Sequence, residues 1–313
     1  MRDKGKYILP TPFIRNPGLC LWLYTTFLTR EHLSRQEGIH LREQVKYTRY
    51  TARRGLLDSQ KPNKFIVWLF CMFGRGVLYL DVKQAFGRTE LLLGADAMQR
   101  LARAHVWVFG AGGVGSFCME ALVRAGCGKL TVVDGDAVDI TNCNRQIIAD
   151  CTTLGIPKVE AAKERALRIN PDIEFCAIHS LFLPENAHKF DFSGTDFIVD
   201  AIDMVSAKLE LAVKAAAENI PLISSMGTGN KLDPSMLEIG DIFQTSMDPL
   251  ARVMRRELKK RGISSLPVVW SKEPPKKGPA APGERPVTAS VPWVPPVAGL
   301  MMAGYVVRAI ARV

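Results

Sequence analysis

Glycines, carboxylates and basic side chains recur between positions 110 and 203 at spacings that suit nucleotide chemistry. A glycine-rich segment, 110–116, lies between an apolar run that ends at Phe109 and a stretch with helical spacing. Its glycines allow a sharp turn and a close approach to a phosphate, and a helix that starts there offers free N–H groups. Asp134 ends a second apolar run, 19 residues after Gly115, where a carboxylate can accept hydrogen bonds from ribose hydroxyls.

Four more charged residues follow at places where a parallel sheet would bring them together. Asp136 is two residues beyond Asp134, so both carboxylates point the same way from an extended chain and can hold a ribose or approach a metal or reacting phosphate. Arg145 is an obligate cation that suits a leaving pyrophosphate, and Lys158 begins a helical segment. Asp203 ends an apolar strand. Ligands bind at the carboxyl ends of such strands, so the sequence predicts an adenylating site, with Asp203 binding Mg²⁺.

The glycine loop by itself is weak evidence, because the same spacing occurs in dinucleotide-binding oxidoreductases. The polar segment that contains Arg145 argues against an oxidoreductase, since hydride transfer has no need for a cation there. The sequence therefore favours a site that activates carboxylates over one that transfers hydride.

Alternating apolar and helical segments predict an α/β fold with a Rossmann-like, doubly wound and mostly parallel sheet. We expect strands near 105–109, 129–134, 175–179, 196–201 and 221–225, and helices over 90–102, 116–125, 159–170, 184–190 and 205–218.

The part after Gly227 has a less regular pattern. It predicts strands over 237–242 and 268–270, a helix from Pro249 to Arg261, a proline-rich loop over 273–296 and an apolar helix over 298–313. The last helix is short for a membrane span, so we expect it to pack internally or at a dimer contact rather than enter a membrane.

These motifs resemble the superfamily of ubiquitin-activating-like adenylyltransferases, which includes the enzymes that activate sulfur-carrier proteins. The resemblance rests on the glycine loop 110–116, Asp134-x-Asp136-x-Val138, Asn144-Arg145-Gln146, Pro157-Lys158 and Asp200-Ala-Ile-Asp203. Within the superfamily, the segments 86–94, 141–146, 241–250 and 290–299 are similar to the branch of tRNA threonylcarbamoyladenosine dehydratases. Met204 departs from the small polar residue usual in the family at that position.

The resemblance implies ATP-dependent dehydration of threonylcarbamoyladenosine in tRNA through an acyl-adenylate, with ATP and Mg²⁺ as cofactors. It assigns nucleotide binding to residues of the loops named above, namely Gly110, Gly112, Gly113, Gly115, Ser116, Asp134, Asp136, Asn142, Asn144, Arg145 and Lys158. Catalysis is assigned to Arg145, Asp136 and Asp203, and the metal to Asp203.

Two other functions stay open at this point. One is an adenylyltransferase that activates the C-terminus of a sulfur-carrier protein, and the other is an NAD-dependent oxidoreductase. The expected partners are a tRNA substrate and a second copy in a homodimer; a cysteine desulfurase or sulfur acceptor is a further candidate.

The seven cysteines separate branches of this superfamily. Relatives that hand a protein on as a thioester use a cysteine well after the second aspartate, and none follows Cys176 here. No C-x-x-C pair occurs, so we expect no structural zinc. Cys143 lies between the polar loop residues and is either reactive or a semi-buried small residue. The lack of a disulfide pattern favours a reducing cytoplasm.

Charge divides the 313 residues into two parts. Residues 1–80 carry 14 Lys and Arg against 5 Asp and Glu, which leaves a net +1 for the rest of a chain of net charge +10. This basic extension has no core pattern and is predicted to be poorly ordered or not part of the native protein, with Met72 as a candidate start; RNA binding and targeting are the alternatives. The adenylyltransferase domain is predicted over 81–313.

Overall fold

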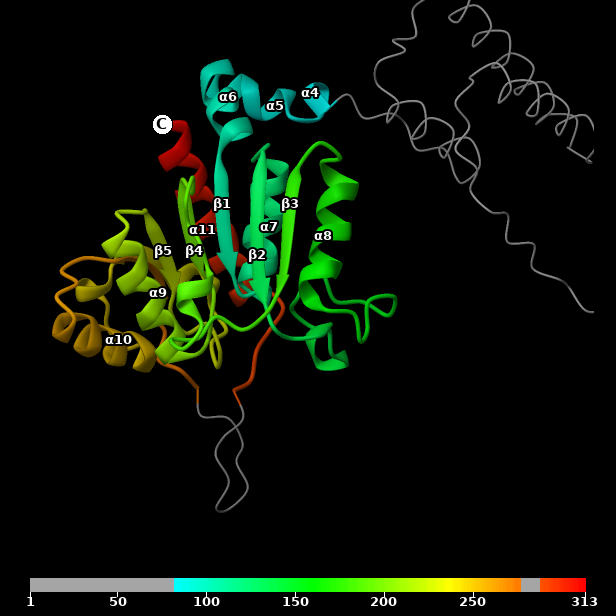
Figure 1. The fold of residues 1–313 in the computed structure, drawn as a ribbon. Helices are drawn as coiled ribbons and strands as arrows, with labels where there is room; N and C mark the ends of the chain where they lie inside the picture. The colour runs from blue at the N-terminus through cyan, green and yellow to red at the C-terminus, as the bar shows by residue number, and fades with distance from the viewer. Residues whose placement is uncertain (1–81, 277–287) are drawn as a thin grey trace, which may run out of the picture. The chain divides into compact units, whose positions relative to one another are not determined.

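A seven-stranded sheet forms the centre of the unit Leu80–Val313 (Figure 1). The computed structural model describes residues 82–276 and 288–313, which belong to the compact unit Leu80–Val313. The strand order is β3-β2-β1-β4-β5-β7-β6, and only β6 runs antiparallel to its neighbour. The strands are β1 His105–Phe109, β2 Lys129–Asp134, β3 Glu174–His179, β4 Phe197–Asp200, β5 Leu222–Ser225, β6 Leu237–Asp241 and β7 Pro267–Ser271.

Helices cover both faces of the sheet, so the predicted doubly wound α/β fold is confirmed. One face packs against α7, α8 and α11, and the other against α9 and α10. The helices are α4 Val82–Ala85, α5 Gly87–Leu93, α6 Ala95–Arg103, α7 Gly115–Arg124, α8 Lys158–Ile169, α9 Val205–Ala217, α10 Pro249–Lys260 and α11 Val294–Ala311. Short 3₁₀ turns are η1 Ile140–Asn142, η2 Ala187–Lys189, η3 Pro234–Met236 and η4 Ile242–Gln244.

The unbroken apolar run of β1 reflects burial on both faces. Val106 and Val108 point into the core formed with α7 and α11, whereas Trp107 and Phe109 point into the opposite core. There the Trp107 ring lies 5.1 Å from that of Phe192 between centroids, in an edge-to-face arrangement. Packing on both faces therefore fixes the position of β1 in the sheet, and the glycine loop begins at the carboxyl end of this strand.

Three boundaries differ from the sequence-based expectation. The helix expected over 90–102 is two helices, α5 and α6, because Gly94 has φ of +86°. The helix expected over 184–190 is reduced to the 3₁₀ turn η2. The strand expected to end at Asp203 ends at Asp200, so Asp203 lies in the loop that follows β4.

The C-terminal helix also starts earlier than expected, at Val294. Pro295 and Pro296 occupy its first turn, where a missing N–H costs nothing because those groups have no intrahelical acceptor. The predicted loop 273–296 is therefore shorter, and its segment 277–287 lies outside the described residues, as does the extension 1–80.

Helix α11 crosses α7 at close range. A Cβ on Gly299 would lie 2.2 Å from the carbonyl oxygen of Val114 and 3.0 Å from the amide nitrogen of Cys118. Within the described part of the chain, α11 is the one helix that is long and apolar enough to span a membrane, with a mean hydropathy of 1.5, and half of it is buried in the molecule. The packing role expected for this helix is confirmed by its contact with α7.

This crossing predicts different effects for two glycines of the same helix. Gly299→Ala should lower the free energy of unfolding by about 1–3 kcal/mol, because the added methyl group meets backbone atoms that cannot move aside. Gly304→Ala is the matched control, since nothing lies within 4 Å of a Cβ there; we expect a gain of about 0.5–1 kcal/mol from helix propensity. Thermal unfolding followed by circular dichroism measures both, and equal midpoints would contradict the close packing.

Candidate functional site

A cavity of about 510 Å³ opens at the carboxyl ends of β1, β2, β4 and β5. This edge is the switch point of the sheet, because the chain continues to one side from β1 to β2 and to the other from β4 to β5. Open α/β sheets bind their ligands at such points. The charged residues that line the cavity are Asp134, Asp136, Arg145, Lys158 and Asp203. The structure thus brings together the charged residues that the sequence predicted for the site.

The glycine loop forms the floor of this cavity, and two of its glycines have no room for a side chain. Gly110 has φ of +89°, and a Cβ there would lie 2.6 Å from the carbonyl oxygen of Ala201. A Cβ on Gly115 would lie 1.7 Å from the carbonyl oxygen of Gly110. The loop can therefore turn directly into α7 and bring the helix N-terminus to the cavity.

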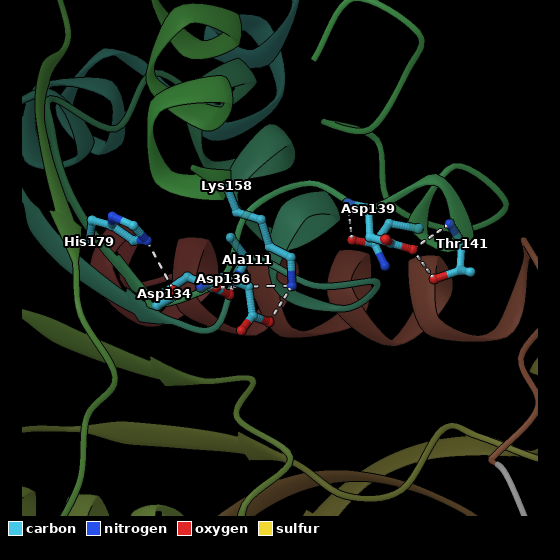
Figure 2. Close-up of polar contacts among 9 residues, drawn as sticks. Ala111, Asp134, Asp136, Asp139, Thr141, Lys158 and His179 are labelled. Atoms are coloured by element: carbon cyan, nitrogen blue, oxygen red, sulfur yellow. Dashed lines mark hydrogen bonds and ion pairs between the residues drawn. The ribbon is translucent and has the colours of Figure 1, made fainter. Parts of the chain in front are cut away.

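Asp134 fixes the shape of this loop (Figure 2). Its Oδ2 accepts a hydrogen bond of 2.7 Å from the amide of Ala111, and its Oδ1 accepts one of 2.8 Å from the amide of Asp136. Each carboxylate oxygen has a second acceptor position left. Asp134 can thus hold the loop and also accept from a ligand hydroxyl in the cavity.

Lys158 lies between the two carboxylates that follow β2. Its Nζ is 2.7 Å from Oδ2 of Asp136 and 4.0 Å from Oδ1 of Asp134, and its side chain is 8% exposed (Figure 2). From β3, Nε2 of His179 hydrogen-bonds to the carbonyl oxygen of Gly135 at 3.0 Å. These contacts hold the 134–136 turn in one position and place a cation in it.

The turn η1 positions Arg145 beside the glycine loop. Asp139 caps the turn by accepting from the Thr141 hydroxyl and amide, and these hydrogen bonds hold the pKa of the Asp139 carboxyl below its usual value. Arg145 donates to the carbonyl oxygen of Thr141 at 3.0 Å and to Oδ1 of Asn144 at 2.9 Å. Its aliphatic stem lies over Gly113, where an added Cβ would be 3.3 Å away. The guanidinium thereby stays at the cavity wall.

Gln146 is a site residue that the sequence analysis named only as part of a motif. Its side chain lines the cavity and is 5% exposed, yet its Oε1 has no hydrogen-bond partner among the residues that the structure describes. A buried polar atom without a partner is costly, and a bound ligand can supply the missing hydrogen bond. This orphaned atom supports ligand binding at this wall.

A fully buried ion pair holds the loop that carries Asp203. Nζ of Lys208 lies 2.9 Å from Oδ2 of Asp200, and the two side chains are 0% and 1% exposed. Lys208 also donates to the carbonyl oxygen of Ile202, and Asp200 accepts from the amide of Ile202 and the hydroxyl of Ser224. Sequence reasoning missed Lys208 because a lysine in a helix gives no sign that it is buried. The one indication in the sequence was the position of Lys208, five residues after Asp203. From there its side chain reaches back to the loop that precedes α9.

Part of the cavity lining contains no charged side chain, and we call it the uncharged chamber. It is formed by Ser225 at the end of β5, by residues that follow it and by residues from the C-terminal part, namely Met226, Gly227, Thr228, Gly229, Leu250, Thr288 and Ser290. A second buried ion pair joins the segments that form this chamber, with Nζ of Lys231 3.1 Å from Oδ2 of Asp248. This chamber was not predicted, because its walls come from segments far apart in the sequence.

Three predicted nucleotide-binding residues do not line the cavity. Gly115 lies behind Gly110, and Ser116 is fully buried with its hydroxyl near the amide of Ile147. Asn144 is exposed and donates to the carbonyl oxygen of Ser290. These three residues therefore shape the loops around the cavity. Their direct contact with a nucleotide stays a prediction.

Metal binding depends on few protein ligands here. Over 82–276 and 288–313, no three His, Cys, Asp or Glu side chains come close enough to hold an ion. Mg²⁺ usually takes one or two carboxylates and completes its shell with water and phosphate oxygens. Asp203, exposed at the cavity and without an ion pair among the described residues, fits that pattern.

The cysteines of the described part are free thiols. Burial raises the pKa of the Cys127 thiol to about 12 and also raises that of Cys118, so both are unreactive at neutral pH. Cys143 is exposed beside the cavity loops, and its reactivity stays a prediction, as does the absence of zinc.

The fold and this site define a nucleotide-binding α/β protein, and comparison with known families gives its class. The ThiF family model matches residues 86–313, and the chain belongs to that family.

Two relatives and a pair of solved structures describe its neighbourhood in the family. Over 235 residues the chain is 41% identical to the tRNA threonylcarbamoyladenosine dehydratase of Bacillus subtilis, covering 71% of this chain and 92% of that protein. Crystal structures of the Escherichia coli tRNA N6-threonylcarbamoyladenosine dehydratase with AMP and with ATP match with TM-scores of 0.68 and 0.67, at 32% identity over 75% of this chain and 98% of theirs. The molybdopterin-synthase adenylyltransferase of Salmonella typhimurium is 34% identical over a shorter stretch, 44% of this chain and 56% of that protein. The family predicted from the motifs is thus confirmed.

The buried pair predicts an asymmetric response to mutation. Lys208→Met should destabilise the protein by about 3–5 kcal/mol, because it leaves the Asp200 carboxylate buried without a counter-charge. Adding Asp200→Asn should recover most of this loss, since the neutral amide keeps a bond to Ser224. Chemical denaturation measures the two variants, and a Lys208→Met protein as stable as the wild type would show that the pair is not buried as described.

Proposed function

We propose that this protein is an ATP-dependent tRNA threonylcarbamoyladenosine dehydratase, which converts threonylcarbamoyladenosine to its cyclic form through an acyl-adenylate. The observation that carries the proposal is one continuous cavity that joins a charged nucleotide half to an uncharged chamber. Its relatives of known activity include the dehydratase that is 41% identical.

ATP occupies the half of the cavity at the ends of β1 and β2. The glycine loop and the N-terminus of α7 face the phosphates, and Asp134 accepts from the ribose hydroxyls. Lys158 and Arg145 supply the positive charge for the phosphates. In this structure Lys158 pairs with Asp136 at 2.7 Å, so a phosphate competes with that carboxylate for the ammonium group.

The substrate carboxylate approaches from the uncharged chamber at the end of β5. A carboxylate oxygen attacks the α-phosphorus of ATP, the bond to the bridging oxygen breaks, and pyrophosphate leaves. Arg145 offsets the charge that grows on the leaving group, while Asp136 stands beside the reacting phosphate. The uncharged walls of the chamber suit an RNA nucleoside whose single reacting carboxylate must be desolvated.

Ring closure follows within the same threonylcarbamoyl group. A nucleophilic atom of that group attacks the acyl carbon, loses its proton, and AMP leaves with the oxygen of the former carboxylate. The substrate thereby loses one water, whose oxygen ends in AMP. Because the nucleophile is tethered, its effective concentration is high and little further catalysis is needed.

Mg²⁺ is part of the proposal, with Asp203 as its protein ligand. When bound, the ion supplies charge neutralisation at the phosphates. The buried Asp200–Lys208 pair fixes the loop that carries Asp203. The Asp203 carboxylate is thereby kept at the cavity before any nucleotide binds.

The assembly and location of the protein belong to the same proposal. A tRNA substrate follows from the activity, and we infer a homodimer and a place in the cytoplasm. Leu91 and Leu92 of α5 are 88% and 84% exposed and offer an apolar surface to a second copy. A sulfur-transfer partner stays a prediction. Activation of a sulfur-carrier protein is the weaker alternative, because its relatives match a smaller part of the chain.

The direct test is incubation of the protein with ATP, magnesium and threonylcarbamoyl-modified tRNA, followed by mass analysis of the nucleosides. We expect a nucleoside lighter by one water, with release of AMP and pyrophosphate. Lys158→Met should abolish the conversion, because it removes a phosphate contact and leaves two carboxylates facing ATP. A wild-type protein that binds ATP but leaves the nucleoside mass unchanged would overturn the proposal.

The metal assignment predicts a specific defect for Asp203→Asn. This change removes one charge without changing the volume, so thermal stability should stay the same while turnover falls by at least 100-fold. ATP should still bind, since its ribose and phosphate contacts lie elsewhere. Full turnover of the variant at limiting magnesium would reject the role of Asp203 as ligand.

The domain boundary gives another prediction. A chain that starts at Met72 should fold and retain ATP-dependent activity, because the motifs and the match to the ThiF family begin after position 80. Yield of soluble protein and steady-state turnover measure this. Insolubility, or a large loss of tRNA affinity, would show that the basic extension has a function.

A further inference from the structure

We propose that the exposed basic face of α10, formed by Arg252, Arg256, Lys259, Lys260 and Arg261, binds phosphates of the tRNA substrate. This inference rests on the proposed function and adds a docking surface outside the cavity.

The charge of this helix stands apart from that of its domain. Between positions 249 and 261 there are six basic residues and one acidic residue. The whole of 81–313 has a net charge of only +1, so the domain without this helix is negative. A positively charged surface on a domain that is otherwise negative attracts nucleic acid to that surface rather than to the entire domain.

The structure separates basic residues that face solvent from one that does not. Arg255 turns inward and donates to the carbonyl oxygen and hydroxyl of Thr245, so it holds η4 against the helix. Arg252 and Lys259 are exposed and form no ion pair among the described residues. Ala251, Met254 and Leu258 are buried in the core on the opposite side. The basic face is therefore a true outer face of an amphipathic helix.

The remaining basic residues are gathered around one carboxylate. Arg256, Lys260 and Arg261 all lie within 3.1 Å of Glu257, and hydrogen bonds from these three lower the pKa of Glu257 to about 2. One negative charge thus holds three cations side by side, with two positive charges in excess. Such clustering orders flexible side chains in advance, which reduces the entropy lost when they bind phosphates.

Helix α10 is fixed to the wall of the cavity. Leu250, in its first turn, lines the uncharged chamber. Asp248 caps the helix through the amide of Ala251 and is paired with the buried Lys231. The same carboxylate lies 3.3 Å from the position of a Cβ on Gly227, another residue of the chamber wall. A nucleoside in the chamber and phosphates on the helix can therefore belong to one RNA strand.

The length of the face suits this arrangement. From Arg252 to Arg261 the face extends about 14 Å, enough for more than one phosphate of a strand that leaves the chamber. The face is rich in Arg and Lys and has no aromatic residue, whereas the core of a protein interface is enriched in aromatic residues and depleted of lysine. Its chemistry therefore favours RNA over a protein partner.

The test compares two variants of the full chain that lose the same charge. The first carries Arg252→Gln, Arg256→Gln and Lys259→Gln, which leaves Arg255 in place. The control carries Arg103→Gln, Arg168→Gln and Lys189→Gln, three exposed residues that do not line the cavity. The measurements are the KM for threonylcarbamoyl-modified tRNA over a range of salt concentrations, the KM for ATP, and filter binding of the same tRNA.

We expect the KM for tRNA to rise at least 10-fold in the α10 variant and less than 2-fold in the control, with the KM for ATP unchanged in both. The slope of log affinity against log salt should become shallower by about two to three, since each of the three lost phosphate contacts removes a little under one unit. Unchanged tRNA affinity, or an equal rise in the control, would overturn the proposal and leave the face to a protein partner or to solvent. Absence of the dehydrated nucleoside with wild-type protein would count against the proposed function alone, because filter binding tests the surface independently.

Discussion

The site depends on the close approach of three backbone segments at the switch point of the sheet. The carbonyl oxygen of Gly110 occupies the space where Gly115 would carry a Cβ, and Gly110 in turn has the carbonyl oxygen of Ala201 where its own Cβ would be. No side chain separates these segments, so the glycine loop, the first turn of α7 and the loop after β4 pack backbone against backbone. Such packing leaves these segments little room to shift, and a preformed wall lowers the cost of binding.

Two buried ion pairs extend this rigidity to the other half. Lys208 with Asp200 fixes the loop of Asp203, and Lys231 with Asp248 fixes the start of α10 against the chamber. Buried ion pairs of this kind add little to stability compared with apolar residues of similar size, because desolvation offsets the attraction. Their consequence here is positional, since Asp200 also accepts the amide of Ile202 in a loop that lines the cavity, and Asp248 accepts the amide of Ala251 in the first turn of α10.

The sequence could predict features that depend on one short segment, and it could not predict those that depend on contacts between distant segments. The glycine loop, the strand-end acids and Arg145 are local features, each readable from its own segment, and the cavity brings the charged ones together. Lys208 and Lys231 could not be predicted as buried, because each acquires its partner only when the sheet forms. The partnerless oxygen of Gln146 and the inward turn of Arg255 are likewise tertiary effects. The errors in regular structure have local causes: Gly94 adopts a positive φ that divides one expected helix, and in the segment 184–190 the Asn186 side chain bonds to the backbone of Leu181 and Leu183 where a longer helix was expected.

Charge balance in the cavity bears on the metal. The lining contains three carboxylates, those of Asp134, Asp136 and Asp203, against two cations, Lys158 and Arg145. A triphosphate that enters this cavity meets walls whose formal charge is net negative, which opposes its binding. The dipole of α7 contributes only about half a positive charge. ATP is therefore expected to enter together with a cation, and the carboxylate of Asp203, which is exposed and has no ion pair within the described residues, is the protein ligand that we propose for that cation.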